Sequence, residues 1–132
     1  MLGLKVALAE SDSVPTLVFD EVDAGVGGAA AAAVGDRLAR LGGAVQVLVV
    51  THSPQVAARG LQHLRIAKKA EGMANRTDVA QLDMDERAEE IARMLAGAKV
   101  TAEARAAALS LLATPAPAAP KKAKPKKVPA AS

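Results

Sequence analysis

The sequence contains no cysteine, tryptophan or tyrosine, and Phe19 is its single aromatic residue. Without thiols the chain can form neither a disulfide framework nor a thiolate metal centre, which agrees with a cytosolic protein. Without aromatic rings to stack on bases, a contact of the lysine-rich C-terminal residues with nucleic acid should be independent of base sequence. Hydrophobic residues still make up 51% of the 132 positions. The core therefore has to be built from Leu, Val, Ile and Met, with much Ala.

Long hydrophobic runs are also missing. No apolar run approaches the ~20 residues that a membrane-spanning helix needs. The first residues, MLGLKVALAE, carry acid and base within an amphipathic pattern that is not typical of a signal peptide. The sequence therefore predicts a cytoplasmic protein without a membrane partner.

Positive charge is concentrated at one end of the chain. The formal net charge is +3, but five lysines lie in residues 121–132, and subtracting them leaves −2 for residues 1–120. Residues 114–132, TPAPAAPKKAKPKKVPAAS, have no apolar periodicity and cannot bury enough surface to offset their ordering entropy. We predict a disordered tail that either aids solubility or makes weak, salt-sensitive contacts with DNA phosphates.

Residues 1–113 have the pattern of one α/β domain. Apolar runs at residues 17–19 and 45–50 predict two strands, and the Ala-rich segment 29–41 between them predicts a helix that ends before Gly42 and Gly43. Such a unit is typical of parallel strands, and the second run is apolar enough to be buried on both faces. Further helices are expected at residues 2–10, 55–58, 84–96 and 101–113, and further strands at 63–67 and 77–82, joined by a turn-rich link at 68–76.

Polar side chains follow both predicted strands. Asp20 and Glu21 end the first strand, within TLVFDEVDAGVGG, whereas Thr51 and His52 end the second. Ligands of parallel α/β sheets bind beyond the carboxyl ends of the strands, and unpaired carboxylates are too costly to bury. Acids, hydroxyl and imidazole together suit a hydrated Mg²⁺ and a phosphate. An ordinary charged turn with a surface histidine is the alternative explanation for each residue taken alone.

The stretches VFDEVDAGVGG and VQVLVVTHSPQVAARG resemble the Walker B, D-loop and switch-histidine region of ABC-type ATPase heads. More narrowly, they are similar to the RecN family of bacterial DNA repair proteins, relatives of the SMC proteins. The likeness continues through LDMDERAEEIARMLAGAKVTAEARAAALSLL and spans residues 2–112. It implies an α/β fold: the C-terminal lobe (1–113) of a partial P-loop NTPase head of the ABC/SMC type, with a mostly parallel sheet flanked by helices.

The resemblance also implies roles for individual residues. Asp20 would be the Walker B residue that binds Mg²⁺ through water, Glu21 the catalytic carboxylate that polarises the attacking water, and His52 the catalytic switch residue that senses the γ-phosphate of ATP. The D-loop, which meets the opposite head in a homodimer of heads, would contribute the cofactor-binding residues Asp23, Gly25, Gly27 and Gly28. ABC heads usually have Asp where this chain has Gly27, and the glycine matches the RecN variant.

Other parts of such a head are missing from the sequence. The phosphate-binding pattern G-x-x-x-x-G-K-[S/T] occurs nowhere, and neither an SGGE-type signature nor a long coiled coil is found. We therefore expect a chain that cannot hydrolyse ATP alone and that needs the N-terminal lobe of the head as partner. The implied parent function is ATP-dependent recombinational repair of DNA double-strand breaks, in the cytoplasm and at the nucleoid.

The residues leave other functions open. The chain could be a half-head that completes a separately encoded lobe in trans, or a non-catalytic α/β protein whose lysine tail contacts DNA. A metal-dependent nuclease of the TOPRIM kind, using Glu21 and nearby acids, lacks an evident DxD element. Since an apolar strand edge would be left unpaired without the missing lobe, we also expect marginal stability of the chain alone.

Overall fold

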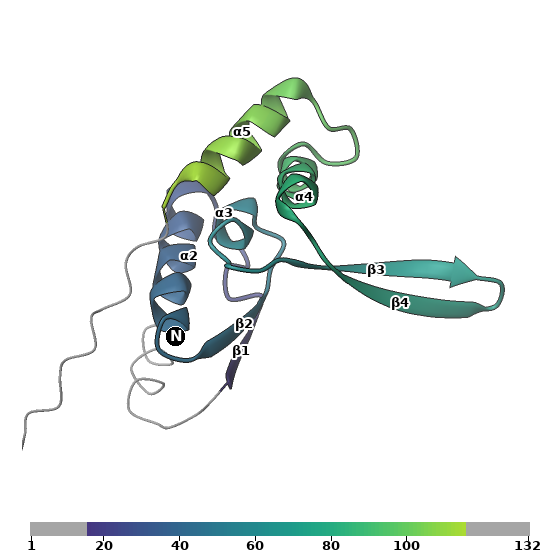
Figure 1. The fold of residues 1–132 in the computed structure, drawn as a ribbon, viewed down its shortest axis with the longest axis horizontal. Coiled ribbons are helices and arrows are strands. Elements are labelled where there is room, and N and C mark those ends of the chain that lie inside the picture. Colours follow the sequence, from purple (N-terminus) through teal and green to yellow (C-terminus); the bar gives the residue numbers. More distant parts are fainter. Residues whose placement is uncertain (1–15, 116–132) are drawn as a thin grey trace, which may run out of the picture.

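A computed structural model of the protein describes residues 16–115 (Figure 1). The elements follow in the order β1 (Thr16–Asp20), α2 (Gly28–Gly42), β2 (Gln46–Val50), α3 (Pro54–Ala57), β3 (Leu64–Glu71), β4 (Ala74–Gln81), α4 (Met84–Ala96) and α5 (Ala102–Ala113). The helix predicted at residues 2–10 and the lysines of the predicted tail lie outside the described residues.

The first half of the chain forms the expected parallel unit. Strands β1 and β2 pair in parallel, from Thr16 opposite Gln46 to Asp20 opposite Val50. Alternate side chains of both strands pack against α2, because successive residues of a strand point to opposite faces. The buried residues of this core are Phe19, Leu38, Leu41 and Val56.

The opposite face of the same sheet is open. Val18, Leu48 and Val50 keep 67%, 46% and 49% of their surfaces exposed, and no third strand pairs with this sheet within residues 16–115. The prediction that the second strand is buried on both faces is therefore wrong for this part of the chain. Burial on both faces needs a second covering layer, and the apolar pattern cannot show whether the same chain supplies it.

Helices α2 and α3 approach each other closely. A Cβ atom added to Gly35 in α2 would lie 3.2 Å from the carbonyl oxygen of Gln55 and 3.2 Å from the Cα of Val56. Gly35 itself is buried. The missing side chain thus allows the backbone of α3 to pack directly on α2.

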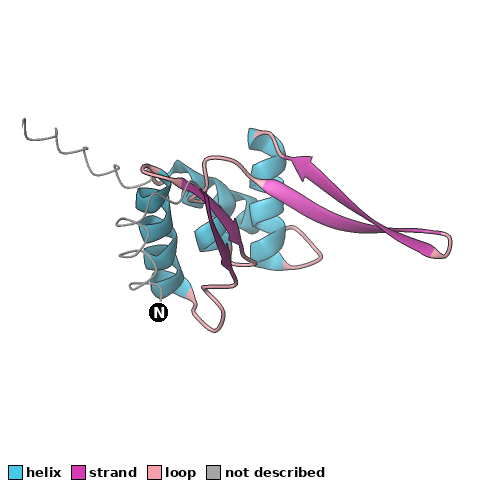
Figure 2. Ribbon diagram, turned by 90° about the horizontal axis from the view of Figure 1, so that it is seen from below, coloured by secondary structure: helices cyan, strands magenta, loops and turns pink. Residues whose placement is uncertain are grey.

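Strands β3 and β4 form an antiparallel hairpin, from Leu64 opposite Gln81 to Glu71 opposite Ala74. The mostly parallel sheet of the prediction is therefore only partly found: one two-stranded sheet is parallel and the other antiparallel. The turn-rich link predicted at 68–76 is wrong, because most of it belongs to the two strands and only Gly72 and Met73 turn, with Gly72 at φ +63°. Figure 2 shows the hairpin extending away from the helices.

Helices α4 and α5 pack against each other in a second core. Asp83 accepts a hydrogen bond from the backbone of Glu86, whose side chain accepts one from the Asp83 amide, so the predicted capping box forms. Ala58, Ile91, Ala92 and Ala108 form the buried cluster of this core. Within residues 16–115 no helix is long and apolar enough to cross a membrane.

Candidate functional site

The loops that follow β1 and β2 lie side by side, because the two strands are parallel and in register. Asp20 is the last residue of β1 and is exposed at this edge, opposite Val50. The amide of Glu21 donates to the carbonyl oxygen of Val50 across a distance of 3.0 Å. The structure therefore brings together the two polar strand ends that the sequence pattern indicated.

Glu21 has an unusual backbone. Its φ is +49°, and it is the single non-glycine residue with positive φ within residues 16–115. A side chain in this left-handed region carries a conformational cost that the surrounding structure has to offset, and such residues cluster at functional sites. The carboxylate is exposed. A strained turn thus presents an acid at the mouth of the sheet, where it can reach a ligand.

Asp23 lies two residues further on, and its carboxylate points inward. The residue is 2% exposed, and its Oδ2 accepts a hydrogen bond from the hydroxyl of Thr51 in the loop after β2. The amide of Ser53 in turn donates to that Thr51 hydroxyl oxygen at 2.9 Å. A side-chain link therefore joins the two strand-end loops in addition to the backbone bond of Glu21.

His52 lies between Thr51 and Ser53 in the chain and is exposed. Helix α3 starts immediately afterwards with Pro54 in its first turn, where a proline's missing N–H costs no hydrogen bond. The imidazole of His52 and the carboxylates of Asp20 and Glu21 are thus carried by neighbouring loops and face solvent.

The glycines of the predicted D-loop lie between β1 and the start of α2. Gly25 and Gly28 have positive φ values of +74° and +54°, and added Cβ atoms at Gly25, Gly27 or Gly28 would meet nothing within 4 Å. Gly25 and Gly28 therefore use glycine for its backbone freedom. The open space around the loop leaves it accessible to a large partner. Gly27 is the N-cap of α2 and makes no side-chain cap bond.

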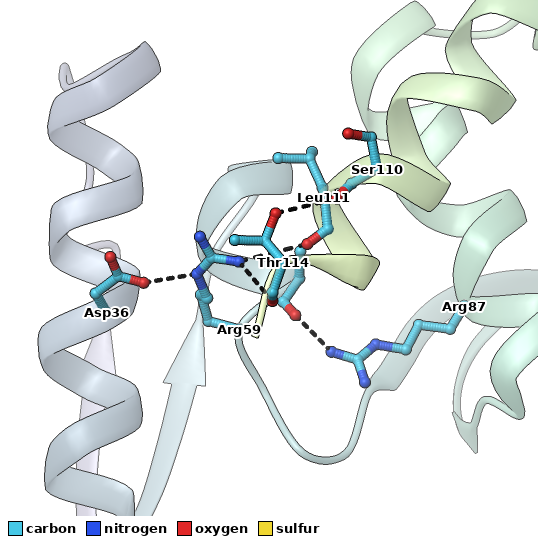
Figure 3. A network of polar contacts seen from close by, with 7 residues as sticks. Asp36, Arg59, Arg87, Ser110, Leu111 and Thr114 are labelled. Atoms are coloured by element: carbon cyan, nitrogen blue, oxygen red, sulfur yellow. Dashed lines mark hydrogen bonds and ion pairs between the residues drawn. The ribbon is translucent and has the colours of Figure 1, made fainter. Parts of the chain in front are cut away.

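A polar network around Arg59 and Arg87, shown in Figure 3, holds the end of α3 and the residues that follow it. The Arg59 Nε donates to Asp36 of α2 at 2.6 Å, and its Nη1 donates to the carbonyl oxygens of Leu111 and Thr114 at the end of α5. The segment that follows His52 is thereby held against both the first and the last described helices.

Arg87 of α4 supplies a further attachment. Its Nη2 donates to the carbonyl oxygens of Ala57 and Ala58, both at 3.1 Å, and to that of Gly60. These oxygens belong to the end of α3, where carbonyls have no partner within the helix. Burial lowers the pKa of Arg87, and burial together with the nearby Arg87 charge lowers the pKa of His63.

The sequence pattern alone did not indicate Arg59, Arg87 or the link between Asp23 and Thr51. One signal was available for Arg87, because it lies on the stripe of α4 that also buries Ile91, so a cation at helical spacing within an apolar stripe needs a buried partner. The contacts of Asp23 and Arg59 join residues 28 and 23 positions apart in the chain, and no local pattern indicates them.

The donor set at the strand ends is compatible with a hydrated magnesium ion. Mg²⁺ keeps several waters and is usually bound by one or two carboxylates, and Asp20 is exposed at the strand end with Glu21 beside it. Within residues 16–115 no three acidic or histidine side chains converge as a metal cage would require. The residues present thus fit an ion held through water and shared with other ligands.

A depression of about 410 Å³ lies elsewhere, between the hairpin and α4. It is lined by Arg65, Asp85, Glu86, Glu89, Glu90, Arg93 and Val100. The Glu90 carboxylate accepts hydrogen bonds from Arg93, which lower the pKa of Glu90. Glu90 pairs with Arg93 and Glu89 pairs with Arg105, so two of these carboxylates already have cationic partners and the strand-end loops are the better candidate site.

No family model matches the chain. Curated relatives do: it is 51% identical over 114 residues to the DNA repair protein RecN of Streptomyces coelicolor, which covers 86% of this chain and 20% of that protein. It is 51% identical over 111 residues to RecN of Xylella fastidiosa, with 84% and 20% covered, and 41% identical over 115 residues to RecN of Rickettsia bellii, with 87% and 21% covered. The chain thus spans about a fifth of the length of these relatives.

The fold is shared with a solved structure from a study of ATP-driven dimerisation and DNA-stimulated activation of SMC ATPases. The two superpose with a TM-score of 0.61 at 19% sequence identity, over 74% of this chain and 58% of that chain. The α/β fold expected from the sequence resemblance is therefore confirmed.

Proposed function

We propose, since this chain belongs to the RecN family, that it forms one lobe of an SMC-type ATPase head and supplies part of a nucleotide site. The observation that carries this proposal is the junction of the two strand-end loops, where the Glu21 amide binds the Val50 carbonyl and Thr51 binds Asp23. It holds Asp20, Glu21 and His52 at one edge of the sheet, open to solvent.

Each of the three residues has a role that suits its position. Asp20 would hold Mg²⁺ through water, and the ion, when bound, would neutralise charge on phosphate oxygens. Glu21 would orient the attacking water and accept its proton, since its carboxylate is exposed on a turn with a constrained backbone and can reach a ligand. His52 would donate a hydrogen bond to a terminal phosphate oxygen from the neighbouring loop.

The rest of the site would come from another lobe. The sequence has no phosphate-binding loop and no P-loop lysine, so we expect no ATP hydrolysis by this chain alone. The exposed sheet face with Val18, Leu48 and Val50 supports a covering partner, because apolar side chains and unpaired strand edges of this kind favour association. The same observation supports the second candidate, a half-head that completes a separately encoded lobe.

The repair role is a proposal of the same kind. The relatives are named as DNA repair proteins, and the study of the solved structure concerns ATP-driven dimerisation and DNA-stimulated activation. By analogy, two heads would associate through the open glycine loop, with Gly25, Gly27 and Gly28, during double-strand-break repair. The lysines of the tail would add a contact with DNA phosphates, and binding that survives deletion of residues 114–132 would refute that contact.

The nucleotide site can be tested by complementation. The chain is mixed with a separately produced N-terminal lobe of a RecN relative, and ATP hydrolysis is measured with Mg²⁺. We expect hydrolysis with the mixture and not with either part, and a loss of about 10²–10⁴-fold in Glu21→Gln. Glu71→Gln, at the exposed far end of β3, is the matched control and should retain activity. Unchanged hydrolysis in Glu21→Gln would refute the assignment.

A further inference from the structure

Asp23 is a buried carboxylate without a cation. At 2% exposure it is among the most buried polar residues described, and no ion pair within residues 16–115 involves it. Its Oδ1 has no hydrogen-bond partner in this part of the chain, while its Oδ2 accepts from Thr51. Desolvating a carboxylate with a single neutral donor is unfavourable, so this arrangement needs an explanation other than stability.

Thr51, the hydrogen-bond partner of Asp23, lies next to His52 in the chain. The Thr51 hydroxyl donates a hydrogen bond to Asp23, and its oxygen accepts one from the amide of Ser53 at 2.9 Å. These two contacts fix the hydroxyl, and His52 lies between Thr51 and Ser53 in the chain. The loop that carries the His52 imidazole is therefore held by a hydrogen bond to Asp23, in the turn that follows Glu21.

We propose that Asp23 is a positioning residue that holds His52 relative to Glu21 through the Thr51 hydroxyl. The inference rests on the proposed nucleotide site and adds to it a residue that touches neither ATP nor metal. It also assigns Asp23 an intramolecular task, because its carboxylate points away from solvent, whereas Ala24, Gly25, Val26 and Gly27 are exposed and free to meet an opposite head. The position of His52 relative to a bound nucleotide would thus depend on the conformation of the glycine loop.

The link itself can be tested in the 132-residue chain without nucleotide. Isotope-labelled protein gives the exchange rate of the Ser53 amide and the imidazole signals of its two histidines, His52 and His63. Thr51→Val removes the hydroxyl at nearly constant shape, and we expect at least about tenfold faster Ser53 exchange and shifted His52 signals. Thr51→Ser keeps the hydroxyl and should retain the native values, with His63 unchanged in both.

The contribution of Asp23 is tested by the same signals. Asp23→Ala should reproduce the effects of Thr51→Val, and Asp23→Asn, which keeps an acceptor oxygen, should have a smaller effect. Asp78→Ala is the matched control, since it removes a carboxylate that lies 2.9 Å from Lys69 and 3.3 Å from Arg76 on the hairpin and should leave the His52 signals unchanged. If Asp23→Ala does not fold, Asp23→Asn decides the result. Native Ser53 exchange and native His52 signals in the Asp23 variants would overturn the link.

Positioning is tested by turnover in the complemented head. Since small displacements of reacting groups cost up to ~10²-fold, we expect Asp23→Ala and Thr51→Val to lower kcat by about ten- to a hundredfold with KM nearly unchanged, and Thr51→Ser to rescue. If the unmodified mixture hydrolyses ATP and both variants retain its kcat, positioning is refuted while the site stands. If the unmodified mixture is inactive, the proposed function fails, and the His52 signals alone then decide whether Asp23 holds this loop.

Discussion

Two parts of the described chain, the unit from β1 to α3 and the β3–β4 hairpin, are held together in different ways. The unit from β1 to α3 buries a core of Phe19, Leu38, Leu41 and Val56, and side-chain links connect its loops. The β3–β4 hairpin is held chiefly by its own backbone ladder, with Leu64, Ile66 and Val79 more than half exposed. Polar residues at the site are thus carried by the part with the denser packing, where small displacements are resisted.

Regular secondary structure therefore does not measure how firmly a segment is fixed. The hairpin has the longest strands of the described residues, yet an isolated two-stranded hairpin is at best marginally stable in water. The loops at the site have no regular structure, but tertiary contacts hold them. We expect amide exchange to be slower at Glu21 and Ser53 than along the far half of β3, since local opening follows buried contacts.

The sharpest test of this difference uses two aliphatic truncations. Leu38→Ala removes a side chain that is 4% exposed, whereas Ile66→Ala removes one that is 63% exposed. We expect the first to lower the free energy of unfolding by about 2–5 kcal/mol and the second by less than about 0.5 kcal/mol. Urea unfolding followed by far-UV circular dichroism measures both, because the chain has no tryptophan or tyrosine for fluorescence. Equal losses would refute the contrast.

A second test compares an arginine of α4 with one of α5. Arg87→Met removes the guanidinium that donates to the carbonyls of Ala57, Ala58 and Gly60, and we expect a loss of about 1–3 kcal/mol in unfolding free energy. Arg105→Met breaks the pair with Glu89, in which the two side chains are 55% and 54% exposed, and should cost at most about 1 kcal/mol. The same urea titration gives both values, and a larger loss for Arg105→Met would contradict the proposed role of Arg87.

The smallest effect is expected at the hairpin's charges. Asp78 lies 2.9 Å from the Lys69 ammonium and 3.3 Å from the Arg76 guanidinium, and all three side chains are substantially exposed. Asp78→Asn should therefore change the free energy of unfolding by less than about 1 kcal/mol, and this change should shrink further in salt. A salt-independent loss of several kcal/mol would show that the hairpin is coupled to the core more tightly than its contacts indicate.

These contrasts explain which features the sequence could predict. Helix α4 agrees with its predicted bounds, 84–96, because the capping box of Asp83 and Glu86 is local chemistry and Gly97 ends the helix. The strands β1 and β2 follow from apolar runs and a right-sized helix between them. The placement of Asp20, Glu21 and His52 at one edge follows from parallel pairing alone, so the candidate site could be located from the pattern.

The features that were missed depend on contacts between distant residues. The outer part of the hairpin has weak strand formers such as Ala70, Glu71 and Asn75, which pair because each strand gives the other its hydrogen-bond partners. Leu48 and Val50 are exposed because no described segment covers their face of the sheet, and a local apolar pattern does not indicate which segment would cover it. The inward orientation of Asp23 depends on Thr51, whose position is set only after the two strands have paired.

The absent side chain of Gly35 has a mechanical consequence. It lets the backbone of Gln55 and Val56 settle into α2 at a distance that a Cβ would crowd, whereas Ala31 and Leu38, the next buried residues along that face, carry side chains. Helix α3 is therefore seated at one height along α2, between these two side chains. A side chain added at Gly35 would push α3 outward, and with it the preceding loop that carries His52.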